Sequence, residues 1–216
     1  MSQYPLDPAY LINDEEALRA LFPQVTPIAA KKSVKQLDKH ARELIARAPF
    51  LCIGTQRPDE QADVSPRGDA PGFVQVLDET TLLIPDRPGN NRLDTQANIL
   101  ANPAVGLLFI IPGFDETLRV NGTARITRDP KLLADSAVNG RVPLTAIIVS
   151  IEEIFIHCAK AFRRSKLWDP SQHQDRREMP SLIEIVLDQT SGRPDDPDEM
   201  RRLNDRLEET YRTKLY

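Results

Sequence analysis

Residues 49–86 read PFLCIGTQRPDEQADVSPRGDAPGFVQVLDETTLLIPD. Short runs of β-branched and apolar residues alternate here with clusters of proline, glycine and aspartate. Runs of this kind, bounded by turn residues, are typical of short strands that follow one another along the chain. We therefore predict four strands in this stretch, with a hairpin tip at residues 78–80. Their ranges are 49–56, 62–69, 72–78 and 80–86.

Further strands are predicted toward the C-terminus. AVGLLFII is a continuous apolar run, and TLRVNGTARITR alternates as a half-buried strand does. TAIIVSIEEIFIHCAKAF is β-branched and apolar for most of its length, which indicates two strand pieces or one long bent strand. These stretches are residues 104–111, 117–128 and 145–162. The chain thus has six or seven strands in mostly antiparallel order.

Helices are predicted between and around these strands, from helical spacing and capping residues. Asn13 or Asp14 can cap the first helix, and Ser33 the second. The ranges are 13–22, 33–48, 90–101, 129–138, 181–189 and 196–215. Antiparallel strands with inserted and appended helices favour an α+β fold, a small barrel with helices at its rim. We expect one domain over 1–216, made of an arm (1–34), a barrel core (35–170) and a helical tail (171–216).

The composition limits the class of protein. Hydrophobic residues make up 40% of the 216 residues, enough for a folded core, and the net charge of −4 provides no basic face for nucleic acid. Two cysteines are too few for a disulfide framework. No apolar stretch approaches the ~20 residues that span a bilayer, and no signal peptide is recognisable. We expect a cytoplasmic protein with neither nucleic-acid nor membrane partners.

Residues 84–103, IPDRPGNNRLDTQANILANP, lead from a strand into a helix. The start of a helix presents unpaired N–H groups and the positive end of its dipole, so it attracts anions. Asn90 or Asn91 could cap this helix, and Arg92 adds a planar guanidinium suited to phosphate. We interpret this stretch as a phosphate site; the alternative is an ordinary capped surface helix with a solvated arginine.

The strand VSPRGDAPGF, residues 64–73, carries polar side chains on one side. Alternation places Ser65, Arg67 and Asp69 on the same face. Gly68 would let a ligand approach the backbone closely. The alternative is a surface ion pair between Arg67 and either Asp69 or Asp63.

Residues 157–168, HCAKAFRRSKLW, are rich in cations, run into a basic turn predicted at 162–170 and contain the only tryptophan. The four cations suit a bound anion, and Trp168 could stack on a flat ring. They are Lys160, Arg163, Arg164 and Lys166. The alternative is a solvated turn beside a core tryptophan.

Other catalytic signatures are missing from the sequence. His157 and Cys158 are strand neighbours that point to opposite faces, so they form no dyad, and we expect Cys158 to be a small packed residue. No spacing of cysteines and histidines completes a zinc site, and no G-x-S-x-G elbow is present.

Together these stretches resemble the pyridoxamine 5′-phosphate oxidase-like superfamily of FMN-binding split barrels, in particular a branch of uncharacterised flavoproteins. The shared motifs, over roughly residues 35–170, are S-P-R-G-D, D-R-x-G-N-x-R, N-P-x-V-G-x-L-F and H-C-x-K-A-x-x-R-S-x-L-W. Here they occupy Ser65–Asp69, Asp86–Arg92, Asn102–Phe109 and His157–Trp168.

The resemblance implies a homodimer that binds two FMN molecules in clefts between its subunits. It places Arg67, with its neighbours Ser65 and Gly68, along the flavin. Further residues belong to the same implied site. Asn90, Asn91 and Arg92 would face the phosphate, and Lys160, Arg164, Ser165 and Trp168 would close the site from one subunit or the other.

The implied function is that of an FMN-dependent oxidoreductase that exchanges hydride or electrons with a small molecule or NAD(P)H. Two alternatives remain: a flavin-binding carrier or redox sensor without turnover, and a split barrel that binds heme or a deazaflavin. True pyridoxamine 5′-phosphate oxidases end in a segment of the type W-x-G-x-x-x-R-L-H-D-R. The nearest match, Arg202–Arg206, lacks the tryptophan, glycine and histidine and lies in a charged helical pattern, so we expect a different substrate.

Overall fold

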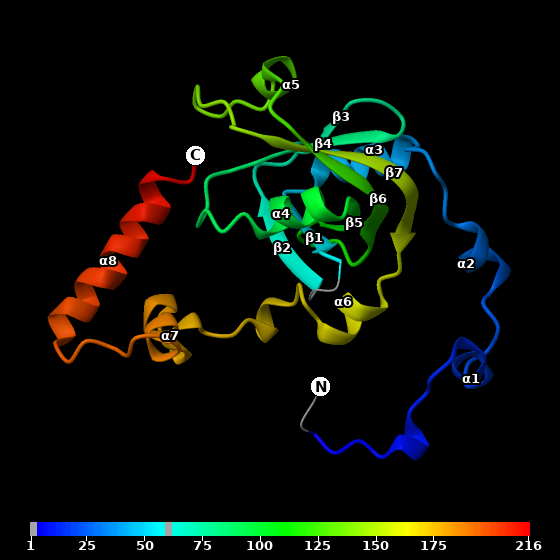
Figure 1. Ribbon diagram of the computed structural model, residues 1–216, viewed down its shortest axis with the longest axis horizontal. Coiled ribbons are helices and arrows are strands. Elements are labelled where there is room, and N and C mark those ends of the chain that lie inside the picture. The colour runs from blue at the N-terminus through cyan, green and yellow to red at the C-terminus, as the bar shows by residue number, and fades with distance from the viewer. Residues whose placement is uncertain (1–3, 59–61) are drawn as a thin grey trace. The chain divides into compact units, whose positions relative to one another are not determined.

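The computed structural model describes residues 4–58 and 62–216 (Figure 1). The chain divides into two compact units, Met1–Ser33 and Val34–Tyr216. In its described part, from residue 4 on, the first unit holds three short helices that bury no residue. They are the 3₁₀ turn η1 (Pro8–Tyr10), α1 (Glu15–Ala20) and α2 (Pro27–Lys31). Of the two caps predicted for the first helix, Asp14 is the one observed: its Oδ1 accepts the Ala17 N–H at 2.8 Å.

The second unit is built on a sheet of seven antiparallel strands in the order β2-β1-β5-β6-β7-β4-β3. This architecture confirms the predicted α+β fold, a mostly antiparallel split barrel with N- and C-terminal helices. Strands β3 and β4 form the expected hairpin around residues 78–80. The strands are β1 (Phe50–Gln56), β2 (Ala62–Gly68), β3 (Gln75–Val76), β4 (Thr81–Pro85), β5 (Ala104–Ile110), β6 (Thr117–Thr127) and β7 (Ala146–His157).

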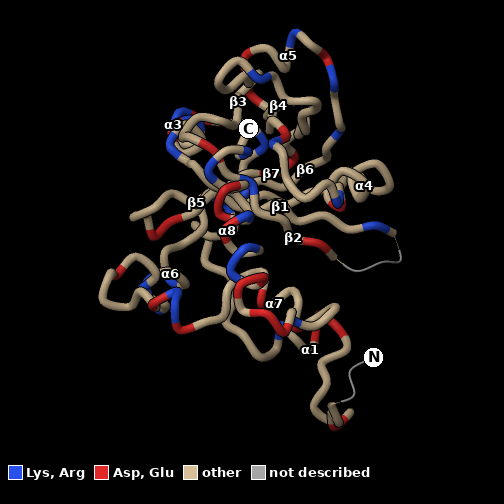
Figure 2. The backbone as a smooth tube through the Cα atoms, turned by 90° about the vertical axis from the view of Figure 1, so that its left-hand side faces the viewer, with Lys and Arg blue, Asp and Glu red and all other residues tan. Residues whose placement is uncertain are grey.

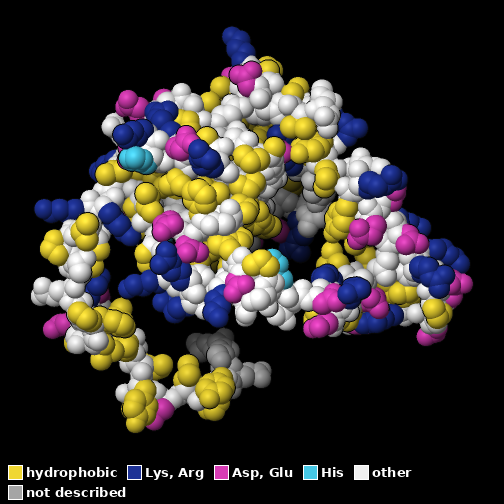
Figure 3. Space-filling model, turned by 180° about the vertical axis from the view of Figure 1, so that it is seen from behind, with side chains coloured by type: hydrophobic (Ala, Val, Ile, Leu, Met, Phe, Trp, Pro, Cys, Tyr) yellow, Lys and Arg dark blue, Asp and Glu magenta, His cyan; other side chains and the backbone are white. Residues whose placement is uncertain are grey.

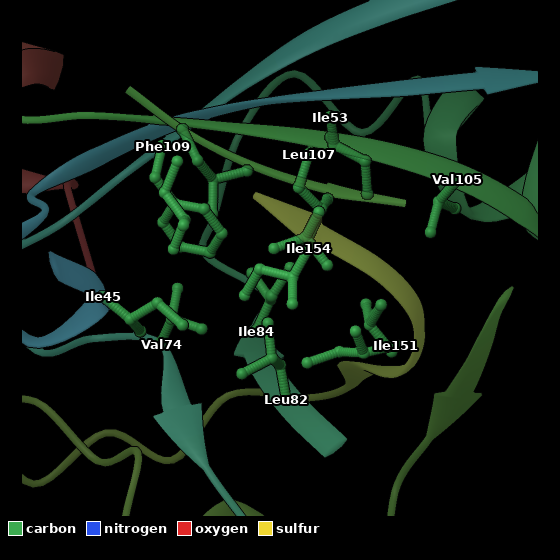
Figure 4. Packing of buried hydrophobic residues seen from close by; sticks show 14 of the residues in the cluster. Ile45, Ile53, Val74, Leu82, Ile84, Val105, Leu107, Phe109, Ile151 and Ile154 are labelled. Carbon is green, nitrogen blue, oxygen red and sulfur yellow. The ribbon is translucent and has the colours of Figure 1, made fainter. Parts of the chain in front are cut away.

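Alternating apolar side chains of the strands fill one hydrophobic core. Figure 4 shows Ile53, Leu107 and Phe109 packed toward Ile84 and Ile154 across the interior of the sheet. Helix α3 (Lys39–Arg47) adds Ala41 and Ile45, and helix α4 (Asp94–Ala101) adds Ile99. On the other face of β4, helix α5 (Pro130–Ala134) packs Leu133 against Leu83 and Ala146.

Strand β7 is one continuous bent strand, which settles the alternative left open by the sequence. It pairs with β6 along its whole length, with a register shift at Asn121 and Gly122. A β-carbon on Gly122 would lie 2.0 Å from the Ser150 carbonyl oxygen, so the two backbones meet there with no room for a side chain. The glycine therefore permits the bend.

The predicted helix at 33–48 begins later than expected, and Ser33 is not its cap. Val34 exchanges two backbone hydrogen bonds with Ile154, of 3.0 and 2.8 Å, which hold the chain extended. The Asp38 carboxylate then accepts the Ala41 N–H at 2.7 Å and starts α3. Strand pairing thus takes precedence over the local helical pattern.

The C-terminal part is helical, and none of its helices buries a residue. α6 (Lys160–Ser165) forms where the end of a strand (145–162) and the start of a turn (162–170) were predicted. Two 3₁₀ turns, η2 (Pro170–Gln172) and η3 (Arg176–Glu178), lead to α7 (Leu182–Asp188) and α8 (Pro197–Thr213). Basic and acidic residues are interspersed along α8 (Figure 2), as expected for a solvated helix. A membrane-spanning helix is not found in the described part of the chain.

Gly122→Ala should destabilise the barrel strongly, because the new methyl group must displace the Ser150 backbone. We expect the free energy of unfolding to fall by roughly 2–4 kcal/mol, at or above the usual cost of overpacking. Urea unfolding followed by circular dichroism measures this change. Gly54→Ala in β1 is the matched control, because its β-carbon would meet only an ordinary contact at 3.7 Å. Equal losses in the two variants would contradict the role of Gly122.

Candidate functional site

Two ion pairs connect the end of strand β2 to the segment that follows strand β4. Arg67 Nη1 lies 2.9 Å from Asp86 Oδ1, and Arg87 Nε lies 2.6 Å from Asp69 Oδ2. The order of charges is reversed between the two segments, since Arg67 precedes Asp69 on one and Asp86 precedes Arg87 on the other. Each arginine therefore faces an aspartate when the two segments lie side by side, with Arg67 opposite Asp86 and Arg87 opposite Asp69.

These pairs are largely shielded from water and hold the two ends of the sheet together. The exposed fraction of the Asp69 side chain is 3%, and that of Arg87 is 17%. Strand β2 is one edge of the sheet, and β4 lies next to the opposite edge. The pairs therefore close the sheet into a barrel. The alternative pairing of Arg67 with Asp69 or Asp63 is wrong.

Helix α4 contacts these ion pairs through its first turn, and we call Arg67, Asp69, Asp86, Arg87 and Gln96 together the Arg67 cluster. Gln96 Nε2 donates to Asp86 Oδ1 at 2.9 Å, so the amide and the Arg67 guanidinium share one carboxylate oxygen. The Nε of Arg67 is buried and has no hydrogen-bond partner among the described residues. A buried donor of this kind is costly unless an acceptor reaches it, and a ligand could supply one.

The loop before α4 differs from the prediction in how the helix begins. Neither Asn90 nor Asn91 caps it; Leu93, in a left-handed conformation with φ 59°, is the N-cap and provides no side-chain hydrogen bond. Asn90 Oδ1 instead accepts the Arg92 backbone N–H at 3.1 Å. Since no side chain caps the helix, the N–H groups of its first turn can still bind an anion.

Arg92 lies at this uncapped helix start and is mostly exposed. The exposed fraction of its side chain is 72%, and its Nε lies 2.7 Å from Asp94 Oδ2. Behind it, Asn98 donates to the Thr55 hydroxyl at 3.0 Å in the interior and anchors α4 on β1. The anchored helix thus presents its N-terminus and Arg92 to solvent, beside Asp86.

A separate set of contacts holds α6 and the residues that follow it. Trp168 Nε1 donates to the Phe114 carbonyl at 2.8 Å, and the indole lies 5.7 Å from the Phe162 ring. Arg163 Nε lies 3.0 Å from Asp115 Oδ2. These bonds tie α6 to the loop between β5 and β6. None of the described hydrogen bonds or ion pairs joins α6 to the Arg67 cluster within one chain.

The other predicted site residues have simple local surroundings. Ser65 Oγ donates to Asp63 Oδ2 at 3.1 Å, and Ser165 Oγ to the Phe162 carbonyl at 3.0 Å. Lys160 and Arg164 are exposed. A β-carbon on Gly68 would contact Phe50 and Pro49 at 3.4 Å, so close packing against β1 already accounts for this glycine.

No site role was predicted for three residues of the Arg67 cluster, and the burial of one cysteine was predicted wrongly. Asp86, Arg87 and Gln96 are central to the cluster, although the D-R pair directly after an apolar strand was a usable signal. Cys158 was expected to be packed but is exposed, because β7 ends at His157 and the chain turns into solvent. The described residues contain no metal-ligand cluster of His, Cys, Asp and Glu.

The Asp69 carboxylate is held in its ionised form. Its burial tends to raise its pKa, but hydrogen bonds from the Tyr216 hydroxyl, the Ala70 N–H and Arg87 outweigh that effect, and the pKa lies below its usual value. The Tyr216 hydroxyl lies 2.7 Å from Asp69 Oδ1, and this bond raises the pKa of the phenol. Asp69 is therefore a fixed negative charge in the cluster.

Arg87→Ala should destabilise the fold markedly, because it removes the cation that faces a buried carboxylate. Breaking a buried pair costs about 3 kcal/mol or more. Arg92→Ala is the matched control; its exposed pair with Asp94 adds little to stability, so urea unfolding should hardly change. A loss in Arg92→Ala as large as that in Arg87→Ala would contradict the assigned burial.

The contribution of Asp69 should depend on pH. Because its pKa is lower in the folded chain than the unfolded value of about 3.9, its stabilisation is complete well above that value and is lost as the pH falls through the folded pKa. We expect the stability difference between wild type and Asp69→Asn to be constant from pH 7 to about pH 5 and to shrink below pH 4. Urea unfolding over this range measures it, and subtraction cancels the other carboxylates. An equal stability difference between wild type and Asp69→Asn at pH 3 and pH 7 would contradict the lowered pKa of Asp69.

Comparison with known proteins matches residues 37–158 to the family described as pyridoxamine 5′-phosphate oxidase. No curated protein matches the chain. Similar solved structures include HupZ of Group A Streptococcus, with 18% identity, 56% of this chain and 93% of that chain covered and a TM-score of 0.46. An F420 reductase has 21% identity, coverage of 56% and 98% and a TM-score of 0.40. An FMN-binding protein from Syntrophomonas wolfei has 13% identity, coverage of 54% and 88% and a TM-score of 0.41.

Structural likeness at this level does not define what this chain binds. The family match is stronger evidence, because it runs from the start of α3 to the end of β7 and includes the whole sheet. It also includes the Arg67 cluster and the uncapped start of α4. Since it covers more than half of the 216 residues, the chain belongs to the pyridoxamine 5′-phosphate oxidase-like family of FMN-binding split barrels.

Proposed function

We propose that the protein binds FMN and transfers hydride or electrons between this cofactor and a small molecule or NAD(P)H. The observation that carries the proposal is the buried Nε of Arg67, without an acceptor in the described structure, next to a helix start without a side-chain cap. A flavin ring offers carbonyl and nitrogen acceptors, and its phosphate suits a helix N-terminus. One ligand can therefore satisfy both features.

The phosphate would lie at the start of α4. Arg92 can reach it with little loss, because the exposed pair of Arg92 with Asp94 contributes little to stability. Asn91 and Leu93 of this loop adopt left-handed conformations, with φ of 58° and 59°. Asn90 and Asn91 would then contribute amide groups around the phosphate.

The isoalloxazine ring would lie along β2, where Arg67 is fixed by Asp86. When bound, FMN supplies the redox chemistry itself, by accepting or donating hydride. The residues of this chain then position the ring and provide charge; no general acid or base of their own is needed. Arg67 beside the ring would favour the anionic reduced form.

We further propose that the working unit is a homodimer, with α6 of one subunit closing the site of the other. Lys160, Arg164, Ser165 and Trp168 would provide this closure. Within one chain, α6 contacts the β5–β6 loop, and none of the described hydrogen bonds or ion pairs joins it to the Arg67 cluster. Cys52, Leu108 and Ile110 are only partly buried on the outward face of β1 and β5. Hydrophobic side chains also gather over the middle of the face that Figure 3 shows. A second copy could cover such a face.

A vitamin B6 substrate has no support. The segment Arg202–Arg206, nearest in sequence to the substrate-holding segment of true pyridoxamine 5′-phosphate oxidases, lies in helix α8, which buries no residue. We therefore propose a different small molecule as the substrate. The alternative of a flavin carrier or sensor keeps the same binding site and differs only in turnover.

Arg92→Ala should weaken FMN binding about tenfold or more, because a charge-assisted phosphate contact is lost. Binding to apoprotein, followed by the quenching of FMN fluorescence, measures the effect. Riboflavin, which lacks the phosphate, should bind wild type and Arg92→Ala equally. FMN that binds no better than riboflavin would refute the phosphate site.

Anaerobic mixing of the FMN-loaded protein with NADH or NADPH separates an enzyme from a carrier. Bleaching of the flavin bands, with reoxidation by an acceptor at a useful rate, is expected for an oxidoreductase. A bound flavin that exchanges electrons with no donor would favour the carrier or sensor.

A further inference from the structure

Tyr216 contacts three segments of the barrel that are far apart in the sequence. Its hydroxyl donates to Asp69 Oδ1 at 2.7 Å, and the Arg87 guanidinium lies 5.6 Å from the centre of its ring. Arg141, which lies between α5 and β7, donates to its backbone oxygen. A cation over an aromatic face is attracted to it, and a hydrogen bond to a carboxylate is stronger than one between neutral groups. These contacts fix Tyr216 on the ion pair that closes the barrel.

Tyr216 is also the point at which the C-terminal segment, residues 181–216, is bonded to the barrel. Helices α7 and α8 of this segment bury no residue. Its other polar contacts are internal; Arg193, for example, pairs with Glu184 and Asp188. Among the described residues, every hydrogen bond, ion pair or cation–π contact between this segment and the rest of the chain involves Tyr216. One residue therefore docks the whole segment.

Asp69 depends on Tyr216 for part of its pairing. Its Oδ2 accepts the Arg87 Nε–H at 2.6 Å, and its Oδ1 accepts the Tyr216 hydroxyl and the Ala70 N–H, at 2.7 Å each. The Asp69 side chain is almost completely buried, so water is a poor substitute for a lost donor. A buried carboxylate that loses a donor is costly. Loss of the Tyr216 hydroxyl therefore weakens the closure of the barrel as well as the docking of the segment.

We infer that Tyr216 is a clasp, which couples the docking of the C-terminal segment to the closure of the barrel. Arg67, which is proposed to lie along the flavin, is two residues before Asp69 in the chain. Its partner Asp86 directly precedes Arg87. Detachment of the segment thus loosens the two segments that hold Arg67 in place. By thermodynamic linkage, a ligand that stabilises the closed cluster also favours the docked segment.

Tyr216→Phe tests the clasp, because it keeps the ring over Arg87 and removes only the hydroxyl. Trypsin should cleave the full-length apoprotein after Lys214 about tenfold faster than in wild type, since cleavage requires the detached segment and a hydrogen bond to a charged group is lost. A synthetic peptide of residues 205–216 with the same substitution corrects for the preference of the protease. Tyr211→Phe, at an exposed position of α8, is the matched control and should be cleaved as wild type.

Urea unfolding of the same variants separates a clasp from a surface contact. In Tyr216→Phe the equilibrium constant for folding should fall about tenfold. The loss should shrink in an Asp69→Asn background, because the charged acceptor is absent there. Tyr211→Phe should unfold as wild type. Cleavage of Tyr216→Phe at the wild-type rate, or faster cleavage with an unchanged folding constant, would overturn the inference.

The effect of the clasp on a ligand rests on the proposed function. FMN should dissociate about fivefold faster from Tyr216→Phe than from wild type or Tyr211→Phe, as followed by stopped-flow flavin fluorescence. Equal rates in the three proteins would overturn the link between the clasp and the Arg67 cluster. A wild type that binds no FMN would refute the proposed function, while trypsin cleavage and urea unfolding of the apoprotein would still decide the clasp.

Discussion

Two ion pairs join the end of β2 to the segment after β4, and the rest of the structure depends on this constraint. An open sheet in the order β2-β1-β5-β6-β7-β4-β3 has its two ends far apart. Arg67 with Asp86, and Asp69 with Arg87, bring those ends together in one register. Because each charge is poorly exposed to water, loss of one partner leaves the other charge unpaired. The free-energy cost of that unpaired charge favours the closed barrel.

Residues that hold these ion pairs serve the fold, whereas residues outside them can bind a ligand without changing it. Arg67 serves the closed barrel as well as the candidate flavin site, so a defect in an Arg67 variant would have two possible causes. Arg92 is held only by an exposed pair and can change partner at little cost. The phosphate end of the site is therefore the part in which binding can be examined without disturbing the fold.

The strands could be predicted from sequence because their apolar periodicity is local, whereas the partners that close the barrel could not. Arg67 and Asp86 are 19 residues apart, and no periodicity links them. Helix starts were misplaced for a similar reason: the pairing of Val34 with Ile154 overrides the helical pattern, and Leu93 begins α4 without a capping side chain. The basic turn before Trp168 gave no apolar spacing from which α6 could be predicted.

The pairing of the cations is consistent with the proposal that α6 contributes to the anion site. Arg67 and Arg87 each pair with a poorly exposed carboxylate, and Arg92 and Arg163 each face an aspartate. Among the described residues, no carboxylate pairs with Lys160 or Arg164 of α6. Besides Arg92, whose exposed pair costs little to break, Lys160 and Arg164 of α6 are therefore candidate cations for a phosphate, while the helix dipole and backbone donors lie at α4. The proposed homodimer would add these cations to the phosphate site by bringing α6 of one copy to α4 of the other.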